Sequence, residues 1–125
     1  MSNAEADVLI VDDETDVCWA LAHLLTRIGV SSLSAHGGEE ALALASAKRF
    51  RLIFVDAKLP DLDGIELAGR LRETHPEIPM VLISGYFYRD DVEVHRAIAT
   101  GAISGFISKP FLHEEVRGIV QRALA

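Results

Sequence analysis

Acidic, hydroxyl and lysine side chains that could share one reaction follow short apolar runs of this sequence. They are Asp12 with Asp13, then Asp56, then Ser84, then Lys109. Three carboxylates brought together would repel, since each close pair costs about 4 kcal/mol at an effective dielectric of ~20. A cation is therefore required. All-oxygen ligands select a hard ion, and Mg²⁺ fits a site that uses few carboxylates and completes its shell with water and phosphate.

Lys109 adds a point charge that can pair with a carboxylate or a phosphoryl oxygen, and Ser84 adds a hydroxyl donor. Each residue also has an ordinary structural explanation, because acids at strand ends cap helices, serines occupy turns and lysines are usually solvated. Their joint position, each after a different apolar run, favours one shared site. In an open α/β sheet, sites assemble at the carboxyl ends of the strands.

The elements that would position these residues alternate along the chain. Runs rich in Val, Ile and Leu predict buried strands over Val8–Val11, Leu52–Val55 and Met80–Ile83, with further strands over Val30–Ala35 and Ile103–Ile107.

Between the strands, apolar spacing predicts an amphipathic helix that carries Val17, Leu21, Leu24 and Ile28 on one stripe and stops at Gly29. Four more helices are expected over 38–48, 65–74, 90–100 and 112–124, the fourth of them ended by Gly101. Because right-handed crossovers place helices on both faces of a parallel sheet, the alternation predicts a doubly wound α/β fold with five strands.

Composition limits the classes of protein. The 125 residues suit one domain, and the formal charge of −7 without a basic stripe argues against nucleic-acid binding. Cys18 is the lone cysteine, and no apolar stretch reaches the length of a membrane span or a signal peptide, so we expect a cytoplasmic protein without a disulfide. Residues 1–6 are expected to be a disordered terminus or an expression remnant, and 7–125 the folded domain.

Several motifs together resemble the receiver domain of two-component response regulators over nearly the whole chain. They are Val-Asp-Asp-Glu at 11–14, Asp56 followed by Leu59-Pro60 and Asp63-Gly64, Ile83-Ser84-Gly85, Gly101-Ala102 and Lys109-Pro110-Phe111. The resemblance implies a flavodoxin-like sheet of order 2-1-3-4-5. It also implies that Asp56 is the phosphoacceptor, that Asp13 and Asp56 bind Mg²⁺ directly, and that Asp12 does so through water.

The same resemblance implies that the backbone carbonyl of Lys58 is a further Mg²⁺ ligand. Ser84 and Lys109 would hold phosphoryl oxygens, Phe106 would be the switch aromatic, and the Lys109-Pro110 peptide would be cis. The implied partner is a sensor histidine kinase or histidine phosphotransfer protein. A homodimer or output partner would use the face formed by 90–100, 103–107 and 112–124. Such a domain is no general enzyme and catalyses only its own phosphorylation and dephosphorylation.

Two other functions fit less well. A haloacid dehalogenase-like phosphatase would need its nucleophile in an Asp-x-Asp motif after the first strand, whereas here Asp12 and Asp13 are adjacent and Asp56 stands alone. A degenerate receiver that acts only as a protein-binding module is disfavoured, because every acid, hydroxyl and lysine position of the pattern is filled.

Other features call for simpler interpretations. Asp61-Leu62-Asp63-Gly64 starts like a calcium loop but lacks its remaining ligands, and Gly37-Gly38 lacks the context of a dinucleotide fingerprint. The five histidines show no metal-ligand spacing, and Cys18 is expected to be packed.

Two further expectations concern residues near or opposite the site. Trp19 lies nearly opposite the apolar stripe of its helix, so we expect it to be exposed and to anchor the kinase. Lys58 and Tyr86 are expected to flank the site and slow loss of the phosphoryl group.

Overall fold

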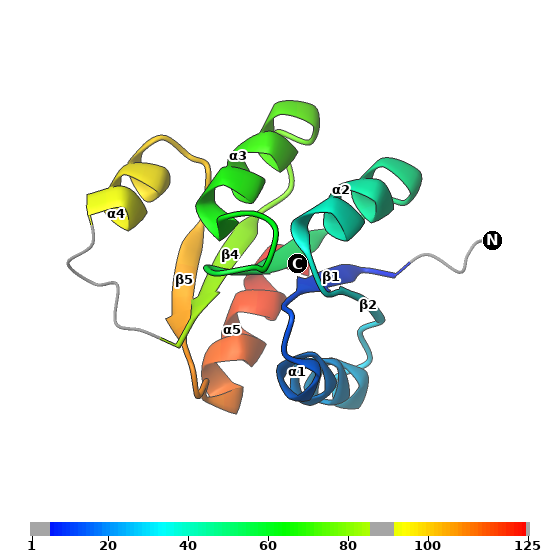
Figure 1. Ribbon diagram of the computed structural model, residues 1–125. Coiled ribbons are helices and arrows are strands. Elements are labelled where there is room, and N and C mark those ends of the chain that lie inside the picture. Colours follow the sequence, from blue (N-terminus) through cyan, green and yellow to red (C-terminus); the bar gives the residue numbers. More distant parts are fainter. Residues whose placement is uncertain (1–5, 86–91, 125) are drawn as a thin grey trace.

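The chain forms a five-stranded parallel sheet with helices on both faces, seen in a computed structural model that describes residues 6–85 and 92–124 (Figure 1). The strands are β1 (Val8–Val11), β2 (Ser32–Ala35), β3 (Leu52–Asp56), β4 (Met80–Ser84) and β5 (Gly105–Ser108), in the order β2-β1-β3-β4-β5. The fold class and the strand order expected from the sequence are confirmed.

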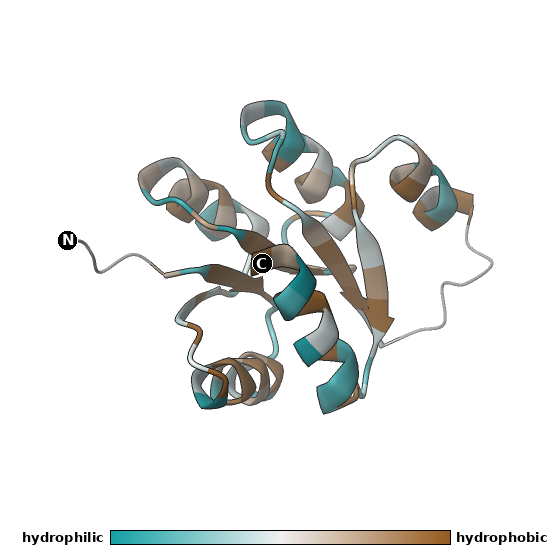
Figure 2. Ribbon diagram, turned by 180° about the vertical axis from the view of Figure 1, so that it is seen from behind, coloured by the Kyte–Doolittle hydropathy of each residue, from teal (hydrophilic) through white to brown (hydrophobic). Residues whose placement is uncertain are grey.

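The helices are α1 (Thr15–Arg27), α2 (Gly38–Ala47), α3 (Gly64–Thr74), α4 (Val92–Ala99) and α5 (His113–Leu124). In Figure 1, α2, α3 and α4 cover one face of the sheet, and α1 and α5 cover the other. Figure 2 shows the strands as the hydrophobic centre between these two layers.

Alternate residues of each central strand feed two separate cores, which explains why the strand sequences are apolar without alternation. In β3, Ile53 and Val55 belong to the core under α2, α3 and α4, whereas Leu52 and Phe54 belong to the core under α1 and α5. Ala6, assigned from the sequence to the disordered terminus, is buried at 5% exposure against the first of these cores.

Two strand predictions were wrong in where the strand begins. β5 begins at Gly105 rather than at Ile103 and continues to Ser108. Ile103 is buried, but its N–H donates to the carbonyl of Ala97 in the turn after α4. Its burial therefore comes from that turn and not from the sheet. The second strand likewise starts at Ser32, because the N–H of Val30 donates to Leu25 in the end of α1.

One boundary of each of α2, α3, α4 and α5 differs from the prediction by one residue, which is within ordinary fraying. The expected start of the fourth helix at Asp90 and the expected role of Tyr86 lie outside the described residues. Gly29 and Gly101 have φ of 81° and 84°, the left-handed conformation with which helices commonly end, so both predicted helix stops are confirmed.

Candidate phosphoacceptor and metal site

Three aspartates meet where β1 and β3 end. The parallel register pairs Val11 with Val55, so Asp12 and Asp56 leave neighbouring strands side by side. Carboxylate oxygens of Asp12, Asp13 and Asp56 lie within 4.8 Å of one another. Asp12 and Asp56 are buried, whereas Asp13 is exposed. The fold therefore gathers the three acids that the sequence singled out, although they come from two separate segments.

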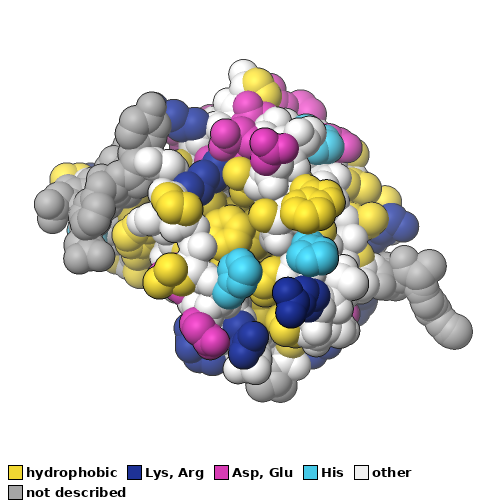
Figure 3. Space-filling view, turned by 90° about the horizontal axis from the view of Figure 1, so that it is seen from below, with side chains coloured by type: hydrophobic (Ala, Val, Ile, Leu, Met, Phe, Trp, Pro, Cys, Tyr) yellow, Lys and Arg dark blue, Asp and Glu magenta, His cyan; other side chains and the backbone are white. Residues whose placement is uncertain are grey.

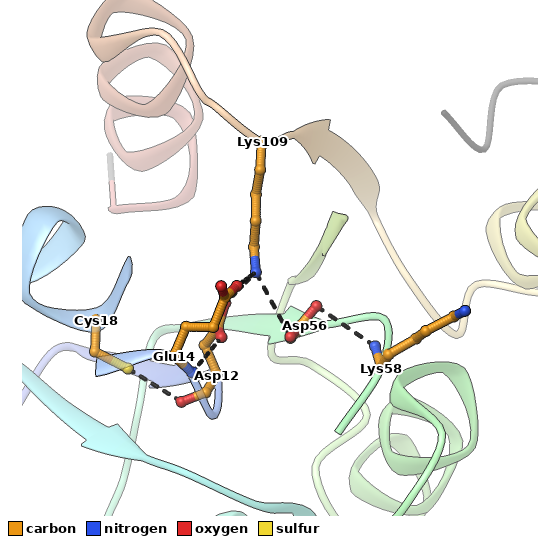
Figure 4. Close-up of polar contacts among 6 residues, drawn as sticks. All are labelled: Asp12, Glu14, Cys18, Asp56, Lys58 and Lys109. Atoms are coloured by element: carbon orange, nitrogen blue, oxygen red, sulfur yellow. Dashed lines mark hydrogen bonds and ion pairs between the residues drawn. The ribbon is translucent and has the colours of Figure 1, made fainter. Parts of the chain in front are cut away.

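Lys109 reaches the same cluster from the loop after β5 (Figure 4). Its Nζ lies 2.9 Å from Oδ2 of Asp12, 2.6 Å from Oε1 of Glu14 and 3.6 Å from Oδ2 of Asp56. Its backbone N–H donates to the carbonyl of Ser84 at 2.6 Å, and the Lys109-Pro110 peptide is cis, as expected.

Charge and burial act in opposite directions on Lys109. Burial alone would lower the pKa of its ammonium group. The hydrogen bond to Glu14 and the close negative charges of Asp12 and Asp56 outweigh that effect and hold the pKa above its ordinary value. Lys109 therefore stays a cation at neutral pH.

Asp56 has the opposite balance. Burial and the neighbouring charge of Asp12 raise the pKa of Asp56 to about 6, even though Lys109 and the N–H of Lys58 favour the carboxylate. This N–H lies 3.4 Å from Oδ1 of Asp56. At neutral pH Asp56 is ionised but is held in an unfavourable environment.

A cleft of about 320 Å³ opens over the cluster. Its lining includes Asp13, Asp56, Lys58, Ser84 and Lys109. Ser84 is buried at the end of β4. It directly follows Ile83, which pairs with Asp56 on the neighbouring strand β3. The cleft therefore gives a small group access to Asp56, with a hydroxyl and an ammonium group on its walls.

The side chains of Lys58 and Phe106 do not point into the acidic cluster. The side chain of Lys58 is exposed and points away from Asp56, so only its backbone faces the cluster (Figure 4). Phe106 is half-buried in β5 and packs against the core on the α4 side. It is neither a fully buried core residue nor a solvent-exposed one.

The donor set fits a hard divalent cation. Three aspartates and Glu14 face a single ammonium group, which leaves a formal excess of three negative charges when all are ionised. Oδ2 of Asp12 is buried and has no hydrogen-bond partner with good geometry, although Lys109 lies near it. Oxygen ligands with unbalanced charge are what Mg²⁺ or Ca²⁺ binds. Within residues 6–85 and 92–124, this is the one group of acidic, histidine or cysteine side chains arranged to hold a metal.

The sequence interpretation missed two contacts of the site. Glu14 pairs with Lys109 across 95 positions of the chain, and Asp61 accepts hydrogen bonds from the start of α2 across 23. Both acids are exposed and lie outside the regularly spaced apolar residues, so the sequence pattern does not predict what they contact. Glu14 directly follows the aspartate pair, which was the only available hint.

Cys18 and Trp19 lie as expected on α1. Cys18 is buried and its thiol contacts the carbonyl of Asp12, while burial raises its pKa. Trp19 is 69% exposed and stacks on His23, with ring centroids 5.1 Å apart. None of the described helices has the length and apolar character needed to span a membrane.

Comparisons with known proteins agree with this geometry. Residues 8–121 match the family described as the response regulator receiver domain. The chain is 39% identical over 120 residues to the nitrogen assimilation regulatory protein NtrX of Azorhizobium caulinodans, covering 94% of this chain but 26% of that protein. It is 25% identical to the DNA-binding transcriptional regulator NtrC of Salmonella typhimurium, of which it covers 24%. The chain therefore spans about a quarter of these curated relatives.

Solved structures give the same result at the level of the fold. The receiver domain of NtrX from Brucella abortus superposes with a TM-score of 0.84 at 33% identity, covering 94% of this chain and 98% of that one. A CheY-like receiver domain protein from Methanospirillum hungatei superposes with a TM-score of 0.87 at 25% identity, covering 97% and 94%.

Proposed function

The chain belongs to the response regulator receiver domain family, and from this membership we propose that Asp56 is the residue that takes the phosphoryl group. Receiver domains of this family are signalling domains of two-component systems that take phosphate from histidine kinases. The observation that carries the assignment is the position of Asp56. It is a buried carboxylate that lines the cleft, 3.6 Å from Nζ of Lys109 and beside two further aspartates.

The proposed reaction forms one bond and breaks one. An oxygen of the Asp56 carboxylate attacks the phosphorus in line, and the P–N bond to the donor histidine breaks, so the electron pair leaves with the imidazole. Lys109 is a cation next to the carboxylate and is suited to pair with a phosphoryl oxygen. Ser84, which also lines the cleft, offers its hydroxyl.

Asp12, Asp13, Asp56 and the backbone carbonyl of Lys58 are the groups we assign to Mg²⁺. When bound, Mg²⁺ supplies charge neutralisation for the phosphoryl oxygens. Burial and then the charge of Asp12 disfavour the ionised form of Asp56 and raise its pKa, and a bound cation would favour the carboxylate that attacks.

Signalling would follow from a rearrangement next to the site. A phosphoryl group adds charge and acceptor oxygens that can draw the Ser84 hydroxyl toward Asp56. Phe106 lies in β5, beside Leu82 of β4, and is half-buried. We assign Phe106 to the switch because an aromatic ring without a hydroxyl can move between a buried and an exposed position without losing a hydrogen bond.

We also propose that the kinase docks on α1. Figure 3 shows hydrophobic side chains on the underside of the domain in Figure 1, with histidine and basic side chains around them. Trp19 of α1 is exposed, and a hollow of about 200 Å³ between α1 and α5 includes His23, Arg27 and Arg117. A large exposed aromatic side chain beside such a hollow is typical of an interface anchor.

Dimer or output contacts through α4, β5 and α5 and a cytoplasmic location stay predictions. So does slow dephosphorylation caused by Lys58 and Tyr86. Direct DNA binding is not expected of this domain, whose formal charge is −7.

Acetyl phosphate with Mg²⁺, followed by intact-mass measurement, tests the proposed function. A stable adduct of one phosphoryl group, absent in Asp56→Asn, is the expected result. Sustained turnover of phosphate esters would instead indicate a phosphatase, and no mass change would indicate a degenerate binding module. Either of these results contradicts the proposal.

A further inference from the structure

Two short motifs without a role in the proposed chemistry are each other's partner in the fold. Gly37-Gly38 lies at the start of α2, and Asp61-Leu62 lies in the loop between Asp56 and α3. The carboxylate of Asp61 accepts hydrogen bonds from the N–H groups of Gly38 at 2.8 Å and Glu39 at 3.0 Å. The first residues of a helix have N–H groups without an intrahelical partner, and Gly37 at the N-cap has no side chain to supply one. Asp61 therefore caps α2 from a different segment of the chain.

The fit between the two motifs leaves no spare room. A Cβ on Gly38 would lie 2.6 Å from Cδ1 of Leu62, and a Cβ on Gly37 would lie 3.2 Å from Oδ1 of Asp61. Backbone hydrogen bonds to Asp61 also keep the pKa of its carboxyl below the ordinary value. The ionised carboxylate of Asp61 thus packs against Gly37 and Gly38. A larger residue at either glycine would require Asp61 or Leu62 to move.

The loop that carries Asp61 is closed on itself. The N–H of Leu59 donates to the carbonyl of Leu62 at 3.3 Å, and Lys58 forms a bridge with Asp63. The N–H of Gly64 donates to the carbonyl of Ala57 at 2.9 Å. The far end is fixed by the Asp63 carboxylate, which accepts from the N–H of Ile65 at 2.8 Å. Because these bonds tie the loop together, a displacement at Asp61 is passed to Lys58.

We propose that Asp61 is a positioning residue for the phosphoacceptor loop. By bonding to the start of α2, Asp61 holds the Ala57–Asp63 loop against the sheet edge and so fixes the Lys58 backbone carbonyl for Mg²⁺. The inference rests on the proposed function, since it takes that carbonyl as a metal ligand. Its consequence is that Mg²⁺ affinity depends on a carboxylate that is not itself a ligand.

Calorimetric titration of Mg²⁺ into the full chain tests this inference. Asp61→Ala should weaken Mg²⁺ binding by about 3- to 10-fold, at or below the lower end of the effects seen for residues that orient metal ligands. Asp61→Asn keeps one acceptor oxygen and should recover part of the loss. Gly38→Ala pushes Leu62 away from the other side and should weaken binding as well.

Ala45→Gly is the matched control, because it destabilises α2 through its buried face and leaves the Asp61 contact unchanged. This variant should lose stability but keep the wild-type Mg²⁺ affinity. At saturating Mg²⁺, Asp61→Ala should accept phosphoryl from acetyl phosphate at close to the wild-type rate. Wild-type affinity in Asp61→Ala, or equal weakening in Ala45→Gly, would overturn the inference. Absence of Mg²⁺ binding in the wild type would overturn the proposed function and the inference together.

Discussion

The half of the domain around β1 and β3 and the half around α4 and β5 are held together in different ways. In the first half, the carboxylates lie at the ends of fully buried strands or directly after them, and the loop after Asp56 is hydrogen-bonded within itself, to α2 and to α3. In the second half, α4 has eight residues and exposes Val92 at 66% and Ile98 at 40%.

The turn after α4 is joined to β4 at Ser104, whose N–H donates to the carbonyl of Met80 at 2.6 Å, and it is joined to α3 by a longer contact. Arg72 of α3 reaches the carbonyl of Ala102 at 3.5 Å, and its Nε is buried without a hydrogen-bond partner. Burial also lowers the pKa of this guanidinium group. Burying the Arg72 guanidinium group without a full set of hydrogen bonds costs free energy. A rearrangement that broke the contact between Arg72 and Ala102 would recover part of that cost.

The two halves of the domain are suited to different roles. Chemistry needs donors and acceptors fixed to a fraction of an ångström, whereas a switch needs an element whose alternative packing costs little. The carboxylate half meets the first need and the α4–β5 half meets the second. Variants in the two halves should therefore differ in which property they change.

The largest difference is expected for phosphorylation. Lys109→Ala should lower the rate of labelling by acetyl phosphate by roughly 10²- to 10³-fold, as for loss of one charge-stabilising donor. Phe106→Leu, in the other half, should label within about 2-fold of wild type, because Phe106 is not among the residues that line the cleft over Asp56. Time courses by intact mass measure both variants. Equal effects of the two variants would remove the distinction between the halves.

The second difference is expected in the cost of replacing a glycine by alanine in each half. A Cβ on Gly64 would collide with the backbone carbonyl of Asp56, whereas Gly101 has open space around it and only a positive φ. Gly64→Ala should cost about 3 kcal/mol of unfolding free energy through overpacking, and Gly101→Ala about 1 kcal/mol through backbone strain. Urea denaturation measures both values. A cost for Gly101→Ala as large as that for Gly64→Ala would show that the α4–β5 half is equally constrained.

Asp56 should make the carboxylate half sensitive to pH when metal is chelated. Its pKa is raised from 3.8 to about 6, so its stabilising contribution is present below about pH 4 and is lost as pH rises through 6. After allowance for partial solvation, Asp56→Asn should raise the free energy of unfolding at pH 7 by about 1–2 kcal/mol, with little gain at pH 4. Melting curves in chelator from pH 4 to 7.5 test this. A gain that is the same at every pH would contradict it.

The smallest effect is expected at Trp19, outside both halves. Trp19→Ala should slow transfer from a histidine kinase by about 3- to 10-fold, and labelling by acetyl phosphate should be unchanged, since only docking is weakened. His23→Ala keeps the indole and removes its stacking partner, and because His23 also lines the hollow between α1 and α5, this variant should slow transfer from the kinase by less than Trp19→Ala does. If both donors lose rate equally, or neither does, Trp19 contributes only local packing.

The sequence predicts the carboxylate half better than the α4–β5 half for a physical reason. Asp12, Asp56 and Ser84 stand directly at the ends of buried strands, so the apolar runs before them set their place on the sheet edge. Ile103 is just as apolar, but a turn buries it, and hydrophobicity does not distinguish that burial from a strand.

Contacts between exposed loops could not be predicted. Glu14 with Lys109 and Asp61 with Gly38 depend on how two distant loops meet once the sheet has formed. Neither Glu14 nor Asp61 lies in a segment with a regular spacing of apolar residues. The pair Gly37-Gly38 indicates that another part of the chain packs closely there, but the sequence does not show which part.

Mapping the modified residue tests the central claim most directly. Wild-type protein is treated with acetyl phosphate and Mg²⁺, the acyl phosphate is reduced with borohydride to the corresponding alcohol, and the peptides are sequenced by mass spectrometry. The proposed function predicts one reduced residue, at Asp56, and none at Asp12 or Asp13. Reduction at Asp12 or Asp13, or at no aspartate, would contradict the assignment of Asp56 as the phosphoacceptor.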